Sequence, residues 1–112
     1  MIRLRSAVEA SLFIRRAESL GGSGVVVQRG DPERGSILLL VSERGEPAAL
    51  LERMLAADGE YRWQLVGAQT SADPRRLAQY FDRRRRNDPD LWLVELDIAP
   101  AQRFIAETIA GG

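Results

Sequence analysis

The sequence predicts an α+β domain of two layers, in which two helices cover a mostly antiparallel sheet of four to six strands. Two stretches with helix-start signals and apolar residues at helical spacing, near residues 6–20 and 73–86, predict the helices. Short apolar segments separated by glycine-containing turns lie between and after them, which is typical of strands. The predicted element order is αββββαβ. Residues 104–109 form either a last short strand or a segment lying against the core.

The first helix is predicted to begin at a capping box and to end at a glycine pair. Ser6 has the hydroxyl suited to the N-cap, and Glu9 stands three residues later. Gly21-Gly22 provides the left-handed stop. The apolar stripe of this helix comprises Ala10, Phe13, Ala17 and Leu20.

Four segments after this helix are predicted to form an antiparallel meander: 25–28, 37–41, 48–55 and 61–66. The run 37–41 is continuously apolar, which suits a central strand buried on both faces. Residues 48–55 also fit helical spacing. We favour a strand there because the neighbouring segments are strands and the flanking turns have hairpin length. Tyr61, Trp63 and Leu65 alternate with their neighbours, so we expect that face to lie in the core.

The stretch from Arg83 to Ile98 organises the C-terminal half of the chain. The second helix opens at 70–74 and ends in the arginines 83–86, where the helix dipole favours cations. Residues 87–90, Asn-Asp-Pro-Asp, then break the helix. Every second residue from Trp92 to Ile98 is apolar, so we expect a buried strand face with Trp92 as its anchor. Arg84 is in phase with the apolar stripe of the helix and should lie over Trp92 or pair with an acid.

Composition restricts the available chemistry. A chain of 112 residues suits one domain, 1–112. It contains no cysteine and no histidine, which removes disulfides, thiolate nucleophiles and imidazole acid–base catalysis. All of the 16 basic residues are arginine, so a lysine Schiff base and the common lysine-containing phosphate loop are also excluded. We therefore expect no cofactor, no metal ligand and no catalytic residue.

The charge balance and hydropathy pattern indicate a cytoplasmic protein. The formal net charge is +0, so no overall electrostatic attraction draws the chain toward nucleic acid or an anionic membrane. There is no run of about 18 apolar residues that would span a membrane. The N-terminal residues have charges scattered among apolar positions, unlike a secretory signal.

Three segments of the chain resemble a known family in order and spacing. They are LFIRRAESLGG at 12–22, QRGDPERGSILL at 28–39 and RRNDPDLWLVEL at 85–96. The resemblance is to the short bacterial proteins grouped as domain of unknown function 1491, and it covers nearly the whole chain. DPDLW-x-VE, at 88–95, is its most specific part. The resemblance implies a single-domain cytoplasmic protein and implies no activity or catalytic residue.

The arginines of the second helix are the main candidate for a contact site. Arg75, Arg76, Arg83 and Arg86 can grip phosphate or carboxylate groups bidentately. The alternative is a solvated helix end that complements the dipole and pairs with neighbouring aspartates. The alternative is favoured, because most charge runs on a neutral chain are solvated surface.

The acidic residues near the last strand are a weaker candidate, for a divalent metal. Asp88, Asp90, Glu95 and Asp97 supply oxygen ligands, but a restriction-type nuclease needs a lysine that this chain lacks. Asp88 and Asp90 are also explained as turn residues around Pro89.

Three functional hypotheses follow, in order of preference. The first is a non-enzymatic interaction module that binds another protein, or a second copy of itself, at a sheet edge or at the arginine-rich helix end. The second is binding of RNA or another polyanion through the arginines. The third and least favoured is an enzyme that uses carboxylates alone. None of the three involves a membrane.

Overall fold

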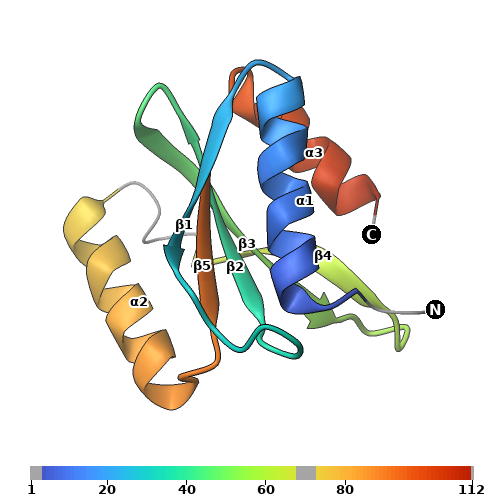
Figure 1. Ribbon diagram of the computed structural model, residues 1–112, viewed down its shortest axis with the longest axis vertical. Coiled ribbons are helices and arrows are strands. Elements are labelled where there is room, and N and C mark those ends of the chain that lie inside the picture. The colour runs from blue at the N-terminus through green and yellow to red at the C-terminus, as the bar shows by residue number, and fades with distance from the viewer. Residues whose placement is uncertain (1–3, 68–72, 112) are drawn as a thin grey trace.

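A computed structural model describes residues 4–67 and 73–111 of the chain (Figure 1). In chain order, the elements are α1 (Ser6–Ser19), β1 (Ser23–Gln28), β2 (Ile37–Glu43), β3 (Glu46–Leu55), β4 (Tyr61–Val66), α2 (Pro74–Asn87), β5 (Trp92–Asp97) and α3 (Ala101–Ala110). The α+β class and the mostly antiparallel sheet are confirmed. None of the helices in these ranges is long and apolar enough to cross a membrane.

The strand order in the sheet is β1-β5-β2-β3-β4. β2, β3 and β4 form the predicted antiparallel meander, but β1 pairs with β5 and not with β2. β5 lies between β1 and β2 and runs parallel to β2. This position follows from burial: β2 and β5 are the most continuously buried strands, and a strand buried on both faces belongs in the middle of a sheet.

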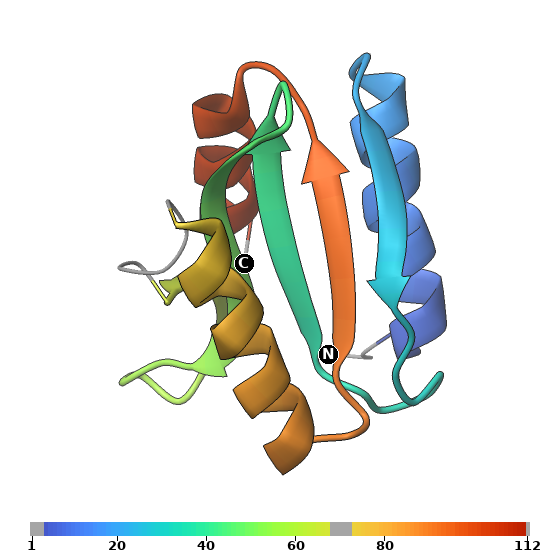
Figure 2. The same ribbon diagram turned by 90° about the vertical axis from the view of Figure 1, so that its left-hand side faces the viewer.

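Helices cover both faces of the sheet, whereas the sequence predicts them on one face. α1 and α3 lie together on one side, and α2 lies on the other (Figures 1 and 2). The residues of β2 alternate between the two sides: Leu39 packs with α1 and α3, and Leu38 and Leu40 pack with Leu77 of α2. Because β2 is apolar on both faces, one helical layer would have left half of its side chains in water.

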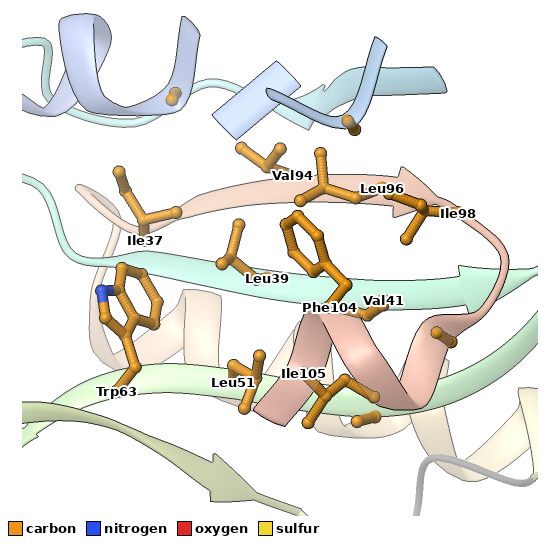
Figure 3. Packing of buried hydrophobic residues seen from close by; sticks show 14 of the residues in the cluster. Ile37, Leu39, Val41, Leu51, Trp63, Val94, Leu96, Ile98, Phe104 and Ile105 are labelled. Atoms are coloured by element: carbon orange, nitrogen blue, oxygen red, sulfur yellow. The ribbon is translucent and has the colours of Figure 1, made fainter. Parts of the chain in front are cut away.

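The larger core lies between the sheet and the helices α1 and α3 (Figure 3). Phe104 of α3 points into this core and is 2% exposed, between Leu39, Val94 and Leu96 of the two central strands (Figure 3). The alternation predicted for β5 is present, since Trp92, Val94, Leu96 and Ile98 all belong to this core.

The C-terminal segment is a helix. Of the two alternatives predicted for residues 104–109, the last short strand was wrong and the segment lying against the core is confirmed. The buried residues of α3 are Ala101, Phe104, Ile105 and Thr108, which follow helical spacing. The segment is too short to show a clear helical period in the sequence, and it follows Pro100 at the end of a predicted strand.

The hairpin of β3 and β4 confirms the strand interpretation of residues 48–55 and corrects one burial prediction. Trp63 is 3% exposed, but Tyr61 and Leu65 are 60% and 56% exposed. Phe13 of α1 covers Trp63, with 5.1 Å between the ring centroids in an edge-to-face contact. The exposure of Tyr61 and Leu65 shows that the helical layer covers the edge strand only at its centre.

The starts of the first two helices also differ from the prediction. The N-cap of α1 is Arg5, and Ser6 lies inside the helix, where its hydroxyl donates to the carbonyl of Gly35 (2.6 Å). Leu20, predicted on the buried stripe of α1, is 53% exposed. Asp73 caps α2 by accepting a hydrogen bond from the backbone N–H of Arg75 (2.9 Å). The predicted helix opening at 70–72 lies outside the described residues.

Candidate functional site

A groove runs between α2 and the edge strand β1. Figure 2 shows the reason: α2 (gold) lies across one side of the sheet, and no helix lies in front of β5 (orange) and β1 (cyan). The groove has a volume of about 270 Å³. We call it the β1–α2 groove; it is lined by Val27, Gln28, Ala78, Phe81, Asp82, Arg85, Leu91 and Leu93.

The floor of the groove is apolar and its β1 wall is exposed. Leu91 and Leu93 are buried, at 3% and 8% exposure. Val27, which lines the groove, is 51% exposed, and Val25, further along the same strand, is 54% exposed. Phe81 packs against the smaller core from the α2 side. Aliphatic side chains that stay half in water beside a buried apolar floor are typical of a surface that another molecule covers.

The groove continues at one end into a polar hollow. This hollow is lined by Asp82, Arg85, Arg86 and Pro89, and it shares Asp82 and Arg85 with the groove. Two arginines, Arg85 and Arg86, and one aspartate, Asp82, therefore surround the place where the groove meets the hollow. In the described part of the chain, Arg85 and Arg86 form no ion pair.

Arg84 has a structural partner on the sheet. Its guanidinium donates to both carboxylate oxygens of Glu52 on β3, at 2.6 and 2.8 Å, and to the hydroxyl of Tyr80, at 3.1 Å. The hydrogen bonds to Glu52 raise the pKa of Arg84 above its ordinary value. The pair fastens α2 to β3. The indole of Trp92 is instead covered by Arg29, at 5.4 Å.

The four arginines proposed as contact residues are exposed and lie on one side of α2. At 3.6 residues per turn their directions fall within an arc of about 100°, with Arg75 and Arg76 in the first turn and Arg83 and Arg86 near the end of the helix. Arg76 lies 3.8 Å from Asp73. Of these four, only Arg86 lines a hollow next to the groove.

Arg85 faces the groove, and the sequence-based site prediction missed it. The signal was present: Arg85 falls on the same side of the helix as Ala78 and Phe81, so it is in phase with apolar residues. The sequence did not show that the edge strand β1 lies across the groove from this side of α2.

Three of the four acidic residues considered as metal ligands, Asp88, Glu95 and Asp97, accept hydrogen bonds within the fold. The carboxylate of Asp88 accepts the backbone N–H of Asp90 (3.1 Å). Glu95 accepts the hydroxyl of Ser42 (3.1 Å), and Asp97 accepts the backbone N–H groups of Arg44 and Gly45 in the β2–β3 turn. Within residues 4–67 and 73–111, no three acidic side chains gather as a metal site would require.

The loop 29–36 is held against the start of β5 and the start of α1. The indole N–H of Trp92 donates to the carbonyl of Asp31 (2.6 Å), and the N–H of Asp31 donates to the carbonyl of Asp90 (3.0 Å). A Cβ at Gly35 would lie 2.1 Å from that same carbonyl of Asp90. The segments GDPERG, at 30–35, and DPDLW, at 88–92, are thus packed closely against each other. This contact explains why each segment has the residues that it has.

Comparison with known proteins identifies one family. The profile of a family described as "Protein of unknown function (DUF1491)" matches residues 4–106. No curated protein matches the chain. A crystal structure of a DUF1491 family protein from Caulobacter crescentus CB15 has 32% identity and a TM-score of 0.74, with 85% of this chain and 88% of that chain covered.

Two solution structures are similar as well. The NMR structure of a DUF1491 family protein from Caulobacter crescentus CB15 has 31% identity and a TM-score of 0.75, covering 93% of this chain and 94% of that one. The structure of a protein from A. tumefaciens has 25% identity and a TM-score of 0.75, covering 96% and 92%. By the extent of the family match and the identity over most of both chains, this protein belongs to the DUF1491 family.

Proposed function

We propose that this protein is a non-enzymatic protein-interaction module of the cytoplasm, and that its partner docks in the β1–α2 groove. The observation that carries the proposal is the pair of half-exposed valines, Val25 and Val27, on an edge strand beside an apolar groove. Aliphatic side chains that are exposed next to a groove favour binding of a partner, because removing their apolar surface from water lowers the free energy.

The lining of the groove favours side chains of a protein over the substrate of an enzyme. A carboxylate-only enzyme needs two acids in one pocket, and among the residues lining the groove only Asp82 is acidic.

A matched pair of substitutions tests the proposal. Val27→Asp places a charge at the groove, and Leu65→Asp places the same charge on an equally exposed position of the opposite sheet edge. We expect the wild type and Leu65→Asp to capture the same partner from the native cytoplasm, and Val27→Asp to lose it. Circular dichroism checks that both variants are folded. Equal capture by the two variants would refute the groove as the docking site.

The second candidate function is binding of RNA or another polyanion through Arg75, Arg76, Arg83 and Arg86. It draws on the exposure of all four guanidinium groups. It predicts an affinity that falls steeply with salt, because each neutralised phosphate releases counterions. Replacing Arg83 and Arg86 by Gln should abolish retention of single-stranded RNA on a filter. Unchanged retention would exclude this patch.

A further inference from the structure

We propose that the part of the sheet that α2 leaves uncovered is covered by α2 of a second copy of this chain, in a dimer with twofold symmetry. This inference rests on the proposed interaction function and names the partner. The uncovered part, which we call the shelf, comprises Val25 and Val27 of β1 and Glu95 and Asp97 of β5. Figure 2 shows that no helix lies in front of these two strands.

The side chains of the shelf point to the α2 side of the sheet. Leu96 packs in the core with α1 and α3, so Glu95 and Asp97 on either side of it point the opposite way. Val26 packs against the same core, so Val25 points to the α2 side. Val25 and Glu95 are directly opposite each other in the pairing of β1 with β5. The shelf therefore presents an exposed aliphatic side chain and a carboxylate next to each other.

The two carboxylates of the shelf have no cationic partner within the described part of the chain. Glu95 accepts the hydroxyl of Ser42, and Asp97 accepts two backbone N–H groups of the β2–β3 turn. Both acids stay partly exposed. Arg29 at the end of β1 stacks on Trp92, whose ring lies on the opposite side of the sheet. The shelf is thus an acidic surface that a cation from another molecule would complement.

The outer side of α2 supplies such cations. At 3.6 residues per turn, Arg75 and Arg86 point roughly opposite to Leu77, which is buried against the sheet. Both arginines are exposed, and in the residues that the structure describes neither side chain forms an ion pair. The sequence of α2 contains a single acid, Asp82. The same molecule therefore carries an unpaired acidic surface and an unpaired cationic one.

These two surfaces lie at the same height along the sheet. α2 ends at Asn87 and leads through a short turn to Trp92, so the helix runs antiparallel to β5 (Figure 2). About 18 Å of helix separate Arg75 from Asn87. About 17 Å of strand separate Trp92 from Asp97. Arg75 is therefore level with the acidic end of the shelf.

A twofold axis parallel to α2 keeps this height and exchanges the two sides of the groove. α2 of the second copy then lies on the shelf beside α2 of the first, and the two helices form one layer between two sheets. The aliphatic stem of Arg75 from the second copy packs on Val25, and its guanidinium reaches Glu95. Because such an interface is isologous, the same contact forms twice.

The groove side of α2 fits the same arrangement. Ala78, Asp82 and Arg85 line the groove and face their counterparts across the axis. The small side chain of Ala78 lets the two helices approach closely. Arg85 lies about one turn from Asp82, so each Arg85 meets Asp82 of the other copy and is not left facing like charge alone.

Sedimentation equilibrium of the full chain tests this dimer. We expect dimers at low salt that high salt weakens. Glu95→Arg and Arg75→Glu should each give monomers, because like charges then meet, and an equimolar mixture of the two variants should restore dimers. Glu95→Gln, which keeps an acceptor for Ser42, should weaken dimerisation about tenfold or more. Arg15→Glu changes an exposed arginine of α1 and should leave the dimer intact.

The outcomes separate this inference from the function on which it rests. A chain that stays monomeric at millimolar concentration and low salt overturns the dimer, whereas loss of a cytoplasmic partner by Val27→Asp would still support docking in the groove. A dimer that survives both charge reversals assembles through another surface, which also overturns the inference. Circular dichroism checks that the variants are folded. If they are folded and their mixture stays monomeric, the contact between Arg75 and Glu95 is refuted.

Discussion

The indole N–H of Trp92 donates a hydrogen bond to the backbone carbonyl of Asp31, with 2.6 Å between the two atoms. This contact joins the first residue of β5 to the loop 29–36. Carbonyl groups of the same loop accept hydrogen bonds from the first N–H groups of α1. The N–H of Ser6 donates to the carbonyl of Glu33, and the N–H of Ala7 donates to the carbonyl of Pro32. One hydrogen bond thus connects a central strand, a loop and a helix start, and the stability of the fold should depend on it.

We predict that Trp92→Phe destabilises the protein by about 0.5–1.5 kcal/mol more than Trp63→Phe, which is the net contribution of one hydrogen bond. Both substitutions remove the same atoms from a buried tryptophan in the same core. Only the first removes a hydrogen bond to the carbonyl of Asp31, which keeps the backbone N–H of Gly35 as its other donor (3.2 Å). Urea unfolding of the two variants measures the difference. Equal destabilisation would show that the indole of Trp92 contributes packing alone.

The bidentate pair of Arg84 and Glu52 should stabilise the packing of α2 on the sheet. A double-mutant cycle with Arg84→Met and Glu52→Gln should give a coupling free energy of about 1–2 kcal/mol, since the pair is partly shielded from solvent. The exposed pair of Arg103 and Glu107 on α3 is the control, with an expected coupling below about 0.5 kcal/mol. Similar couplings in both cycles would contradict the structural role of Arg84.

Two glycine-to-alanine changes should differ widely in cost. At Gly35 a Cβ would lie 2.1 Å from the carbonyl oxygen of Asp90, so Gly35→Ala requires the backbone to move and should abolish two-state folding. At Gly59 the space is open, and the cost is only that of a positive φ of 85°, about 1–2 kcal/mol. Thermal unfolding of both variants checks this order. A Gly35→Ala protein of near-wild-type stability would show that the two segments do not interlock closely.

Asp31 should make stability dependent on acid. The backbone N–H groups of Arg34 and Glu33 donate to its carboxylate, both at 2.9 Å, and hold its pKa below the ordinary value. A lowered folded-state pKa stabilises the fold above the unfolded value of about 3.9, and the effect is lost as pH falls through the folded pKa. Stability should therefore drop below about pH 4, and less so in Asp31→Asn. Parallel pH–stability curves for the two proteins would contradict this linkage.

The individual elements were largely readable from the chain because their signals are local. Period-two alternation from Trp92 to Ile98 identified β5, and the polar breaker at 87–90 separated it from α2. The phase of Arg84 on α2 indicated that this cation turns inward. Where such local signals were short or mixed, as in α3 and at Tyr61, the expected structure differed from the observed one.

Sequence by itself determined the type of most elements and the buried face of β5, since these depend on residues near one another in the chain. The absence of cysteine, histidine and lysine can also be read from the sequence directly. Only the tertiary structure decided that β5 separates β1 from β2, leaving β1 at an edge with α2 facing it across a groove. Strand order depends on contacts between distant segments, and β2 and β5 have the apolar surface to occupy the centre together. The position of Arg85 beside the groove also depends on that pairing, because the strand on the other side of the groove comes from a distant segment of the chain.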